Sequence, residues 1–381
     1  MKILLTGIDG YTGWPLALAL SKKFKKAKII GVDSLKRREW VKNIKSKSAI
    51  KISSMSARIS TAKKYGYNNI FFIKGDLINK KFVFKLFKKY KFDLVIHTAA
   101  QPSAPYANYN IERCYFTHLN NNLSTLNLLW AINFFKKTKK IRLITTTTTG
   151  VYGQPNFKIP EGFVKASNKG KSEVIQFGNM GSSWYHITKS NDINNLWLAN
   201  KLWKIQITDL RTSIIYGTDT EDTIKDGKLA TRFDFDYFFG VVINRFCAMS
   251  VINHNLTVYG KGLLKRPFIS LKDYVRSTIN LISSKQKNSF EVLNQTTELL
   301  CIRDIAELVS KESKLLGFNC KINFLTNPRI EKESHRMEME NSKFLKVLKK
   351  RPDNFRFELK NILKTLARNK ITIEKYKKIL I

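Results

Sequence analysis

Short apolar runs alternate with amphipathic stretches along the first half of the chain. The runs KILLTG, KIIGVD, FFIKGD, DLVIHTAA and IRLITTTTTG have strand length, and residues 11–24, 79–90 and 120–137 between them show helical spacing. A long helix is expected over 183–203 and a strand over 206–217. Strands that alternate with helices predict βαβ units, and therefore an α/β fold with a Rossmann-type, doubly wound parallel sheet.

The pattern becomes less regular after residue 214. Segments such as NLTVYGKG, RPFISLKDYV and CIRDIAELVSKESKLL suggest short strands and helices. We therefore predict a cofactor-binding Rossmann domain over residues 1–214 and a smaller substrate-binding lobe over 215–381. Parts of 241–290 are expected to return to the main sheet.

Composition supports a folded protein outside the membrane. Hydrophobic residues make up 43% of the 381 positions, which is enough for a buried core. The chain contains no uncharged apolar run of about 18 residues and starts without a secretory signal. We expect a soluble, cytoplasmic protein. The four cysteines are scattered and not grouped with histidines, so reduced thiols are expected and no metal site.

The formal net charge of +39 is large. The lysines are spread along the chain, mostly on the polar faces of the expected helices, and no nucleic-acid motif is present. Solvated surfaces explain this pattern, so no nucleic-acid partner is expected, and the charge would favour small anionic substrates. The alternative is a non-catalytic protein that binds a polyanion.

A glycine-rich turn separates the first strand from the first helix. Gly7, Gly10 and Gly13 form G-x-x-G-x-x-G around Tyr11 and Thr12. Glycines there permit a tight turn and close approach of the backbone to a pyrophosphate, which the helix N-terminus would hold.

An acidic residue follows the second strand at the spacing of a dinucleotide site. Asp33 lies twenty residues beyond Gly13 (33 − 13) and is placed to bind the adenosine ribose. An acid there favours NAD over NADP. Because the basic residues 36–38 follow, NADP stays an alternative cofactor. Asp76, after the next strand, is placed to contact the adenine.

A tyrosine and a lysine share one face of the long helix. Tyr185 and Lys189 form Y-x-x-x-K, and residues four apart on a helix are neighbours. The lysine cation is expected to lower the pKa of the phenol, so that tyrosinate can accept a proton from a sugar hydroxyl.

With the glycine turn and this pair, the sequence resembles the extended short-chain dehydrogenase/reductases, the family of nucleotide-sugar epimerases and dehydratases. The resemblance implies that Thr148, in TTTTTGVYG, binds the reacting hydroxyl, while the other threonines mostly pack. Sugar 4,6-dehydratases have T-D-E-V-Y-G here. Thr149 and Gly150 replace both acids, so ordinary dehydration is not expected.

Ordered stretches across nearly the whole chain resemble the UDP-sulfoquinovose synthase family: GYTGW, QPSAPYA, THLNN, GVYGQPN, SSWYHITK, TDLRTSIIYG, FDYFFGVVINRFC, RPFISLKD and NPRIEKESH. This resemblance implies a tightly bound NAD, UDP-glucose as substrate and sulfite as the nucleophile in sulfolipid or sulfosugar biosynthesis. It makes His186 a catalytic residue near C5 and C6, with a simple helix-face position as the alternative.

The same resemblance assigns further binding residues. Besides the glycine turn, Asp33 and Asp76, cofactor contacts are expected from Leu77, Thr98, Asn121 and Lys189. The substrate would be bound by Gln101, Ser103, Tyr106, Thr148, Tyr185, Asn244, Arg245, Tyr259, Arg266 and Arg329, with arginines suited to a diphosphate.

Two positions depart from the synthase pattern. Pro102 replaces an arginine, and Thr149 replaces a methionine. AAQPS also resembles CDP-sugar 2-epimerases, so an NAD-dependent epimerase of a UDP- or CDP-sugar is the alternative function. Family members often form homodimers through two helices, here around 113–137 and 183–203. Leu126, Leu129, Leu196 and Trp203 are candidate contacts, and packing within the monomer explains the same pattern.

Overall fold

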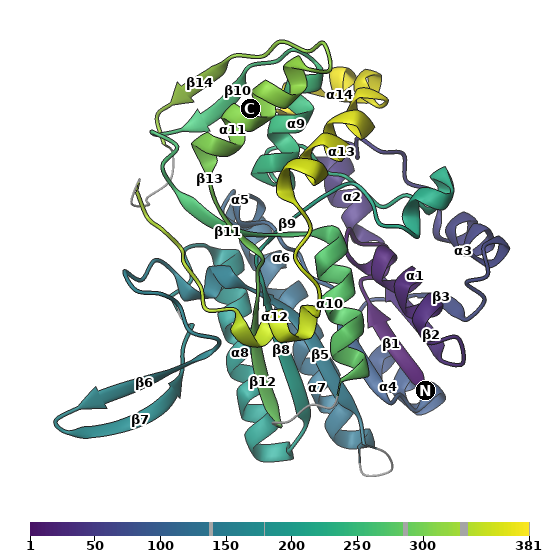
Figure 1. Cartoon of the computed structure of the whole chain (residues 1–381). Helices are drawn as coiled ribbons and strands as arrows, with labels where there is room; N and C mark the ends of the chain where they lie inside the picture. The colour runs from purple at the N-terminus through teal and green to yellow at the C-terminus, as the bar shows by residue number, and fades with distance from the viewer. Residues whose placement is uncertain (137–139, 179, 285–288, 328–333, 381) are drawn as a thin grey trace.

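The computed structural model describes the chain except residues 137–139, 179, 285–288, 328–333 and 381. Its largest element is a seven-stranded sheet with the order β12-β8-β5-β4-β1-β2-β3, parallel throughout (Figure 1). The strands are β1 (Lys2–Thr6), β2 (Lys28–Asp33), β3 (Ile70–Lys74), β4 (Leu94–His97), β5 (Arg142–Thr148), β8 (Gln206–Thr212) and β12 (Phe290–Gln295). The predicted parallel, doubly wound sheet is confirmed.

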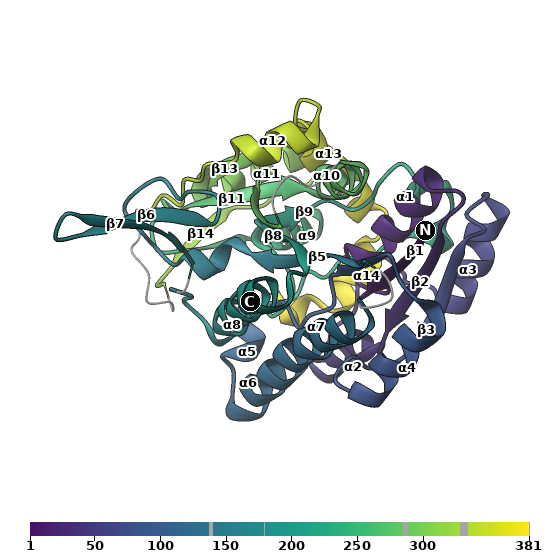
Figure 2. The ribbon, with the colours of Figure 1, turned by 90° about the horizontal axis from the view of Figure 1, so that it is seen from below.

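Helices cover both faces of this sheet (Figure 2). Because successive side chains of a strand point to opposite faces, Ile3 and Leu5 join one core while Leu4 joins another. The first core is covered by α1 (Gly13–Lys23), α3 (Met55–Lys64), α10 (Leu271–Ser283) and α12 (Ser342–Leu348). The second is covered by α4 (Lys80–Tyr90), α7 (Ser124–Phe135) and α8 (Trp184–Trp203).

Short elements connect these layers at the edge of the sheet. They are α2 (Lys36–Asn43), α5 (Ala104–Ala107), α6 (Ile111–His118) and the π-helical turn η1 (Leu119–Leu123) that leads into α7. The predicted helix at 120–137 therefore begins with a π turn, a feature that often marks functional sites.

A second lobe lies above the carboxyl ends of the large sheet (Figure 1). It contains a three-stranded sheet of β9 (Ile214–Tyr216), β11 (Lys265–Ser270) and β13 (Glu298–Cys301), and the parallel pair β10 (Leu256–Tyr259) and β14 (Ile322–Leu325). Helices α9 (Val242–Val251), α11 (Ile302–Lys314), α13 (Phe355–Ala367) and α14 (Lys370–Lys375) enclose a separate core with Phe246, Val258, Ile305 and Leu363. The chain returns to the large sheet at α10, β12 and α12.

A hairpin of β6 (Phe163–Asn168) and β7 (Lys171–Gln176) projects from the body of the molecule (Figure 1). Its two-residue turn has positive φ at Lys169 and Gly170, which is the geometry that joins twisted antiparallel strands. Sequence analysis did not identify this hairpin. Within the described part of the chain, every helix is too short or too polar to cross a bilayer.

Candidate active site

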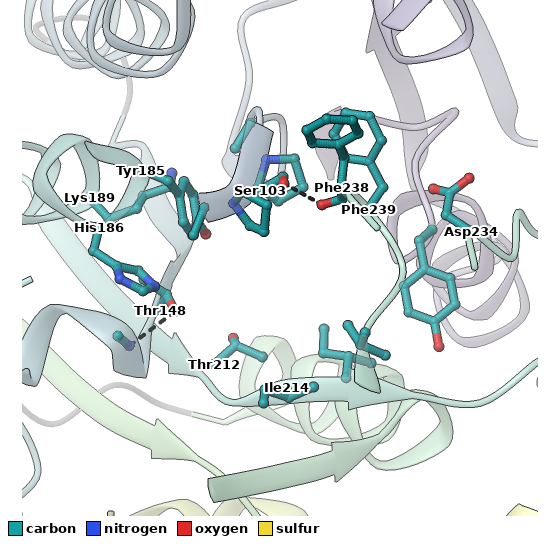
Figure 3. Close-up of a pocket in the computed structure, with 18 of the residues that line it drawn as sticks. Ser103, Thr148, Tyr185, His186, Lys189, Thr212, Ile214, Asp234, Phe238 and Phe239 are labelled. Carbon is teal, nitrogen blue, oxygen red and sulfur yellow. Dashed lines mark hydrogen bonds between the residues drawn. The ribbon is translucent and has the colours of Figure 1, made fainter. Parts of the chain in front are cut away.

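A cavity of about 1140 Å³ separates the large sheet from the second lobe. Parallel strands end at one edge of a sheet, and ligands bind there in doubly wound folds. The residues that end β2 and β5, Asp33 and Thr148, line the cavity from below, and Asn244 and Arg266 line it from the second lobe. Figure 3 shows Thr148, Tyr185, His186 and Lys189 gathered at one end and Asp234 at the other.

The glycine turn meets the requirements of a dinucleotide site. Gly7 has φ +77°, and a Cβ there would lie 2.9 Å from the backbone of Ala99. A Cβ on Gly13 would lie 2.0 Å from the carbonyl oxygen of Gly7. Any side chain would therefore push the turn apart. Four of the five predicted residues, Gly7, Gly10, Tyr11 and Thr12, line the cavity, whereas Gly13 lies behind them at the start of α1.

The carboxylate of Asp33 is held by two backbone amides. Asp9 N donates to its Oδ2 at 3.0 Å, and Leu35 N donates to its Oδ1 at 2.7 Å. A carboxylate has about four acceptor positions, so both oxygens keep lone pairs for ribose hydroxyls. Asp76, Leu77 and Thr98 also line this end of the cavity.

The three basic residues that follow Asp33 are each paired with a carboxylate: Lys36 with Asp76 (2.6 Å), Arg37 with Asp234 (2.8 Å), and Arg38 with Asp9 (two bonds of 2.7 Å). Since an acid already holds each cation, little positive charge is left to attract a 2′-phosphate. The structure thus favours NAD over NADP on electrostatic grounds.

Asp9 is the centre of a buried ion network. Besides Arg38, it accepts a bond from Arg58 at 3.1 Å and lies 3.8 Å from Arg232. Burial would raise the pKa of Asp234, but Arg37 and Arg232 outweigh it, so its pKa lies below the usual value. Charges from distant parts of the chain therefore hold the glycine turn in place.

The threonine run forms the end of β5. Thr145 and Thr147 are buried, and Thr147 donates to Asp209 at 2.5 Å. Thr148 faces the cavity, accepts a bond from Gly150 N at 3.2 Å, and hydrogen-bonds to the phenol of Tyr185. One threonine thus contacts the tyrosine while its neighbours pack against the sheet.

Helix α8 presents Tyr185 and Lys189 to the cavity from one face. Ser183 caps its N-terminus, because the serine hydroxyl accepts a bond from His186 N at 3.1 Å. Lys189 Nζ, however, is paired with Asp192 Oδ2 at 3.1 Å. Burial and the charge of Asp192 raise the pKa of Tyr185, although Thr148 partly opposes this. The expected lowering of this pKa is wrong, because burial first, and then the charge of Asp192, raise it.

The ring of His186 fills the space that is free because residue 150 is a glycine. A Cβ on Gly150 would lie 2.2 Å from His186 Nε2. On the other side of the ring, Ser182 Oγ lies 3.4 Å from Nδ1. The imidazole therefore stands beside Thr148 and Tyr185 (Figure 3), in the place where a dehydratase-like sequence would carry an acid. An imidazole there can donate or accept a proton near neutral pH.

The predicted substrate residues fall into two groups. Ser103, Asn244, Arg245, Tyr259 and Arg266 line the cavity. Asn244 Oδ1 is buried and has no hydrogen-bond partner among the described residues. A buried acceptor of this kind is suited to accept a hydrogen bond from a bound ligand.

The other predicted residues support the wall without lining it. Gln101 is fully buried and donates to Thr117 at 2.8 Å, and Asn121 bonds to both backbone groups of Gln101. Tyr106 stacks on Phe239. Arg329 lies outside the described residues. No group of three or more His, Cys, Asp or Glu able to hold a metal occurs in the described part of the chain.

Sequence analysis missed three buried charged residues of this site. The position of Asp192 could have been predicted from the sequence, because it follows Lys189 by three residues and so shares its helix face. Arg232 and Asp234 line the cavity itself, unlike Asp192, but they come from a segment about 200 residues after the glycine turn. No local pattern indicated that contact.

Comparison with known proteins places the chain in a family. Residues 3–294 match the model of the NAD dependent epimerase/dehydratase family. The chain is 36% identical to UDP-sulfoquinovose synthase of Sulfolobus acidocaldarius, over 100% of this chain and 96% of that protein. It is 35% identical to the chloroplastic UDP-sulfoquinovose synthase of Spinacia oleracea, over 91% of this chain and 71% of that protein.

The chain belongs to the NAD-dependent epimerase/dehydratase family and, within it, to the UDP-sulfoquinovose synthases. Among solved structures, UDP-glucuronic acid 4-epimerase of Bacillus cereus matches with a TM-score of 0.69 and 23% identity, over 99% of this chain and 100% of that one. A dTDP-glucose 4,6-dehydratase of Bacillus anthracis matches with a TM-score of 0.67 and 18% identity, over 98% and 99%. These two likenesses support the fold of the chain.

Proposed function

We propose that the protein is a UDP-sulfoquinovose synthase that converts UDP-glucose and sulfite into UDP-sulfoquinovose and water. The observation that carries the proposal is the grouping of Thr148, Tyr185 and His186 beside a cavity whose residues 149 and 150 carry no acid. The two synthases that match most of the chain support it. The product would serve sulfolipid or sulfosugar biosynthesis.

The glycine turn and Asp33 would hold NAD, which when bound would supply reversible hydride transfer at C4 of the glucose. Tyr185 accepts the proton of the C4 hydroxyl, and Thr148 hydrogen-bonds the same oxygen. The C4 carbonyl acidifies the proton on C5, which His186 removes and passes to the C6 hydroxyl, so that this group leaves as water. Sulfite adds to C6 through sulfur, a proton from solvent is added to C5, and Tyr185 reprotonates the C4 oxygen. The reaction is redox-neutral.

The residues of the second lobe would bind the nucleotide. Arg245 and Arg266 suit the diphosphate because guanidinium groups make forked, charge-assisted bonds to phosphate. Asn244 would use its buried carbonyl oxygen to accept a bond from the ligand. Ser103 lies on the same cavity wall.

The decisive experiment incubates the purified protein with UDP-glucose and sulfite and analyses the UDP-sugar by mass spectrometry and NMR. We expect a carbon-bound sulfonate at C6. The His186→Gln variant should lose sulfonate formation while it still oxidises C4, which NADH absorbance detects. Unchanged or C4-epimerised sugar from the wild-type protein would contradict the proposal.

The second candidate is a nucleotide-sugar epimerase. It is favoured by Pro102, which lines the cavity where the synthase pattern has an arginine that could face an anion. Turnover in deuterated water separates the two candidates. A C4 epimerase leaves every carbon-bound hydrogen in place, whereas the synthase reaction puts deuterium on C5.

We also propose a cytoplasmic homodimer that pairs helices α7 and α8 of two subunits. Leu129 and Leu196 are buried within the monomer, so these two candidate contacts pack in its own core. Support comes instead from large apolar side chains that α7 and α8 expose, namely Trp130, Phe134, Leu198 and Leu202. Light scattering should give the dimer mass, and Phe134→Glu with Leu198→Glu should give the monomer mass. Cell fractionation tests the localisation.

A further inference from the structure

A buried carboxylate stands directly behind the proposed catalytic pair. Lys189 and Asp192 lie on one face of α8, and their side chains are only 3% and 2% exposed. Lys189 Nζ donates to Asp192 Oδ2 at 3.1 Å. Water cannot screen charges at this depth, so the two charges act strongly on each other and on any titrating neighbour.

Two neighbouring elements hold Asp192 in this position. Asn122 Nδ2, from the π turn η1, donates to Asp192 Oδ1 at 3.0 Å, and the hydroxyl of Thr125, on α7, also bonds to the carboxylate. Burial raises the pKa of Asp192, while Lys189, Asn122 and Thr125 oppose the rise. The carboxylate is therefore fixed by donors on three elements.

The other groups around the pair are neutral or face the cavity. His97 of β4 lies behind Thr125, with Nε2 at 3.4 Å from its hydroxyl and Nδ1 at 2.8 Å from Thr6 Oγ1. Burial and the charge of Lys189 lower the pKa of His97 to about 3, so it is uncharged at neutral pH. From the cavity side, Tyr185 meets Thr148 and the ring of His186.

We propose that Asp192 is a positioning residue that holds Lys189 and offsets its positive charge beside Tyr185. This inference rests on the proposed role of Tyr185 as the base. It does not depend on which sugar or nucleophile the enzyme uses.

The physical reason is the balance of charges near the phenol. A cation within about 4–6 Å lowers the pKa of an acid by about 1–3 units, and a nearby anion raises it. Asp192 places an anion next to the cation, and its charge raises the pKa of Tyr185. Replacing the carboxylate by a neutral group of the same shape leaves the cation unopposed.

The first test titrates the cofactor-free protein. Tyrosinate absorbance is recorded against pH for each protein, and the curve of its matched Tyr185→Phe variant is subtracted. In the parent, Tyr185 should not ionise at or below the ordinary tyrosine pKa of about 10. In Asp192→Asn its apparent pKa should fall by at least about one unit, and the acid limb of the kcat/KM profile should move in the same direction. Asp192→Glu should restore the parental titration.

Asp273→Asn is the matched control. Asp273 is also fully buried on a helix and paired, to Arg276 at 2.8 Å, but it lies on α10 and does not line the cavity. It should lower stability without moving the titration of Tyr185. A folded Asp192→Asn protein in which Tyr185 titrates as in the parent, or at higher pH, overturns the proposal.

A double variant covers the case in which Asp192→Asn does not fold. Asp192→Leu with Lys189→Met removes both charges, a change that buried ion pairs often tolerate. If the two charges offset each other, the titration of Tyr185 should stay within about half a unit of the parent. A rise of one unit or more would mean that Lys189 acts on Tyr185 unopposed, and would overturn the proposal. These titrations need no substrate, so they remain informative if sulfonate formation fails.

Discussion

At the glycine-turn end of the cavity, Asp9 and Asp234 hold four arginines from three parts of the chain. At the Tyr185 end, a single aspartate holds a single lysine on the same helix. The first arrangement ties distant segments together and leaves the cofactor site with paired cations. The second adjusts the proton affinity of one phenol. Buried charge thus serves assembly at one end and acid–base chemistry at the other.

The largest effect is expected from the catalytic end. Tyr185→Phe removes the proposed base and keeps the ring, so kcat should fall by about 10³-fold while the urea midpoint stays the same. Single-turnover NADH absorbance measures the loss. Tyr65→Phe, on the exposed surface, should behave as the parent. Residual turnover above a tenth of the parent would assign the base to another group.

At the glycine-turn end, the main loss should be in stability. Asp9→Asn leaves Arg58 buried and without its carboxylate, which should lower the free energy of unfolding by about 3–5 kcal/mol. Urea denaturation measures it. Glu307→Gln, an exposed change on α11, is the control and should cost less than about 0.5 kcal/mol. An equally small loss for Asp9→Asn would remove the assembly role assigned to this network.

The same end should also control cofactor choice. Asp234→Ala removes the carboxylate that pairs with Arg37, whose guanidinium lies 3.4 Å from the ring centre of Phe239 at the cavity wall. The same change removes one of the two carboxylates near Arg232. The preference for NAD over NADP should fall by about tenfold, the value of one charge-assisted bond. Binding of both cofactors by fluorescence titration measures the ratio. An unchanged ratio would show that Arg37 does not reach the 2′ position.

The smallest effect should come from acids outside both ends. Burial raises the pKa of Asp273 to about 6 and of Glu298 to about 7, from 3.8 and 4.5. The folded protein therefore holds protons that the unfolded chain has released, so stability falls as pH rises from about 4 to about 7. The melting temperature should drop by a few degrees across this window. Glu298→Gln should flatten the decrease, and a stability that rises with pH would contradict these shifts.

Much of the fold and part of the site could be predicted from local sequence. The glycine turn, Asp33, the threonine strand and the face shared by Tyr185 and Lys189 each depend on residues close together in the chain. Gln101, Tyr106 and Asn121 were assigned to ligands, yet the structure uses them to brace the cavity wall. A side chain's direction depends on the tertiary packing of its loop, which local spacing does not specify.

The sequence by itself determined the order of strands and helices, the glycines that the turn requires, and the family, because periodicity and motif spacing are properties of neighbouring residues. Only the tertiary structure decided which charges meet. Arg232 and Asp234 reach the glycine turn across some 200 residues, and burial of Tyr185, with the charge of Asp192 second, reverses the expected direction of its pKa shift. Electrostatic effects depend on distance and burial, and both are set by packing between distant segments.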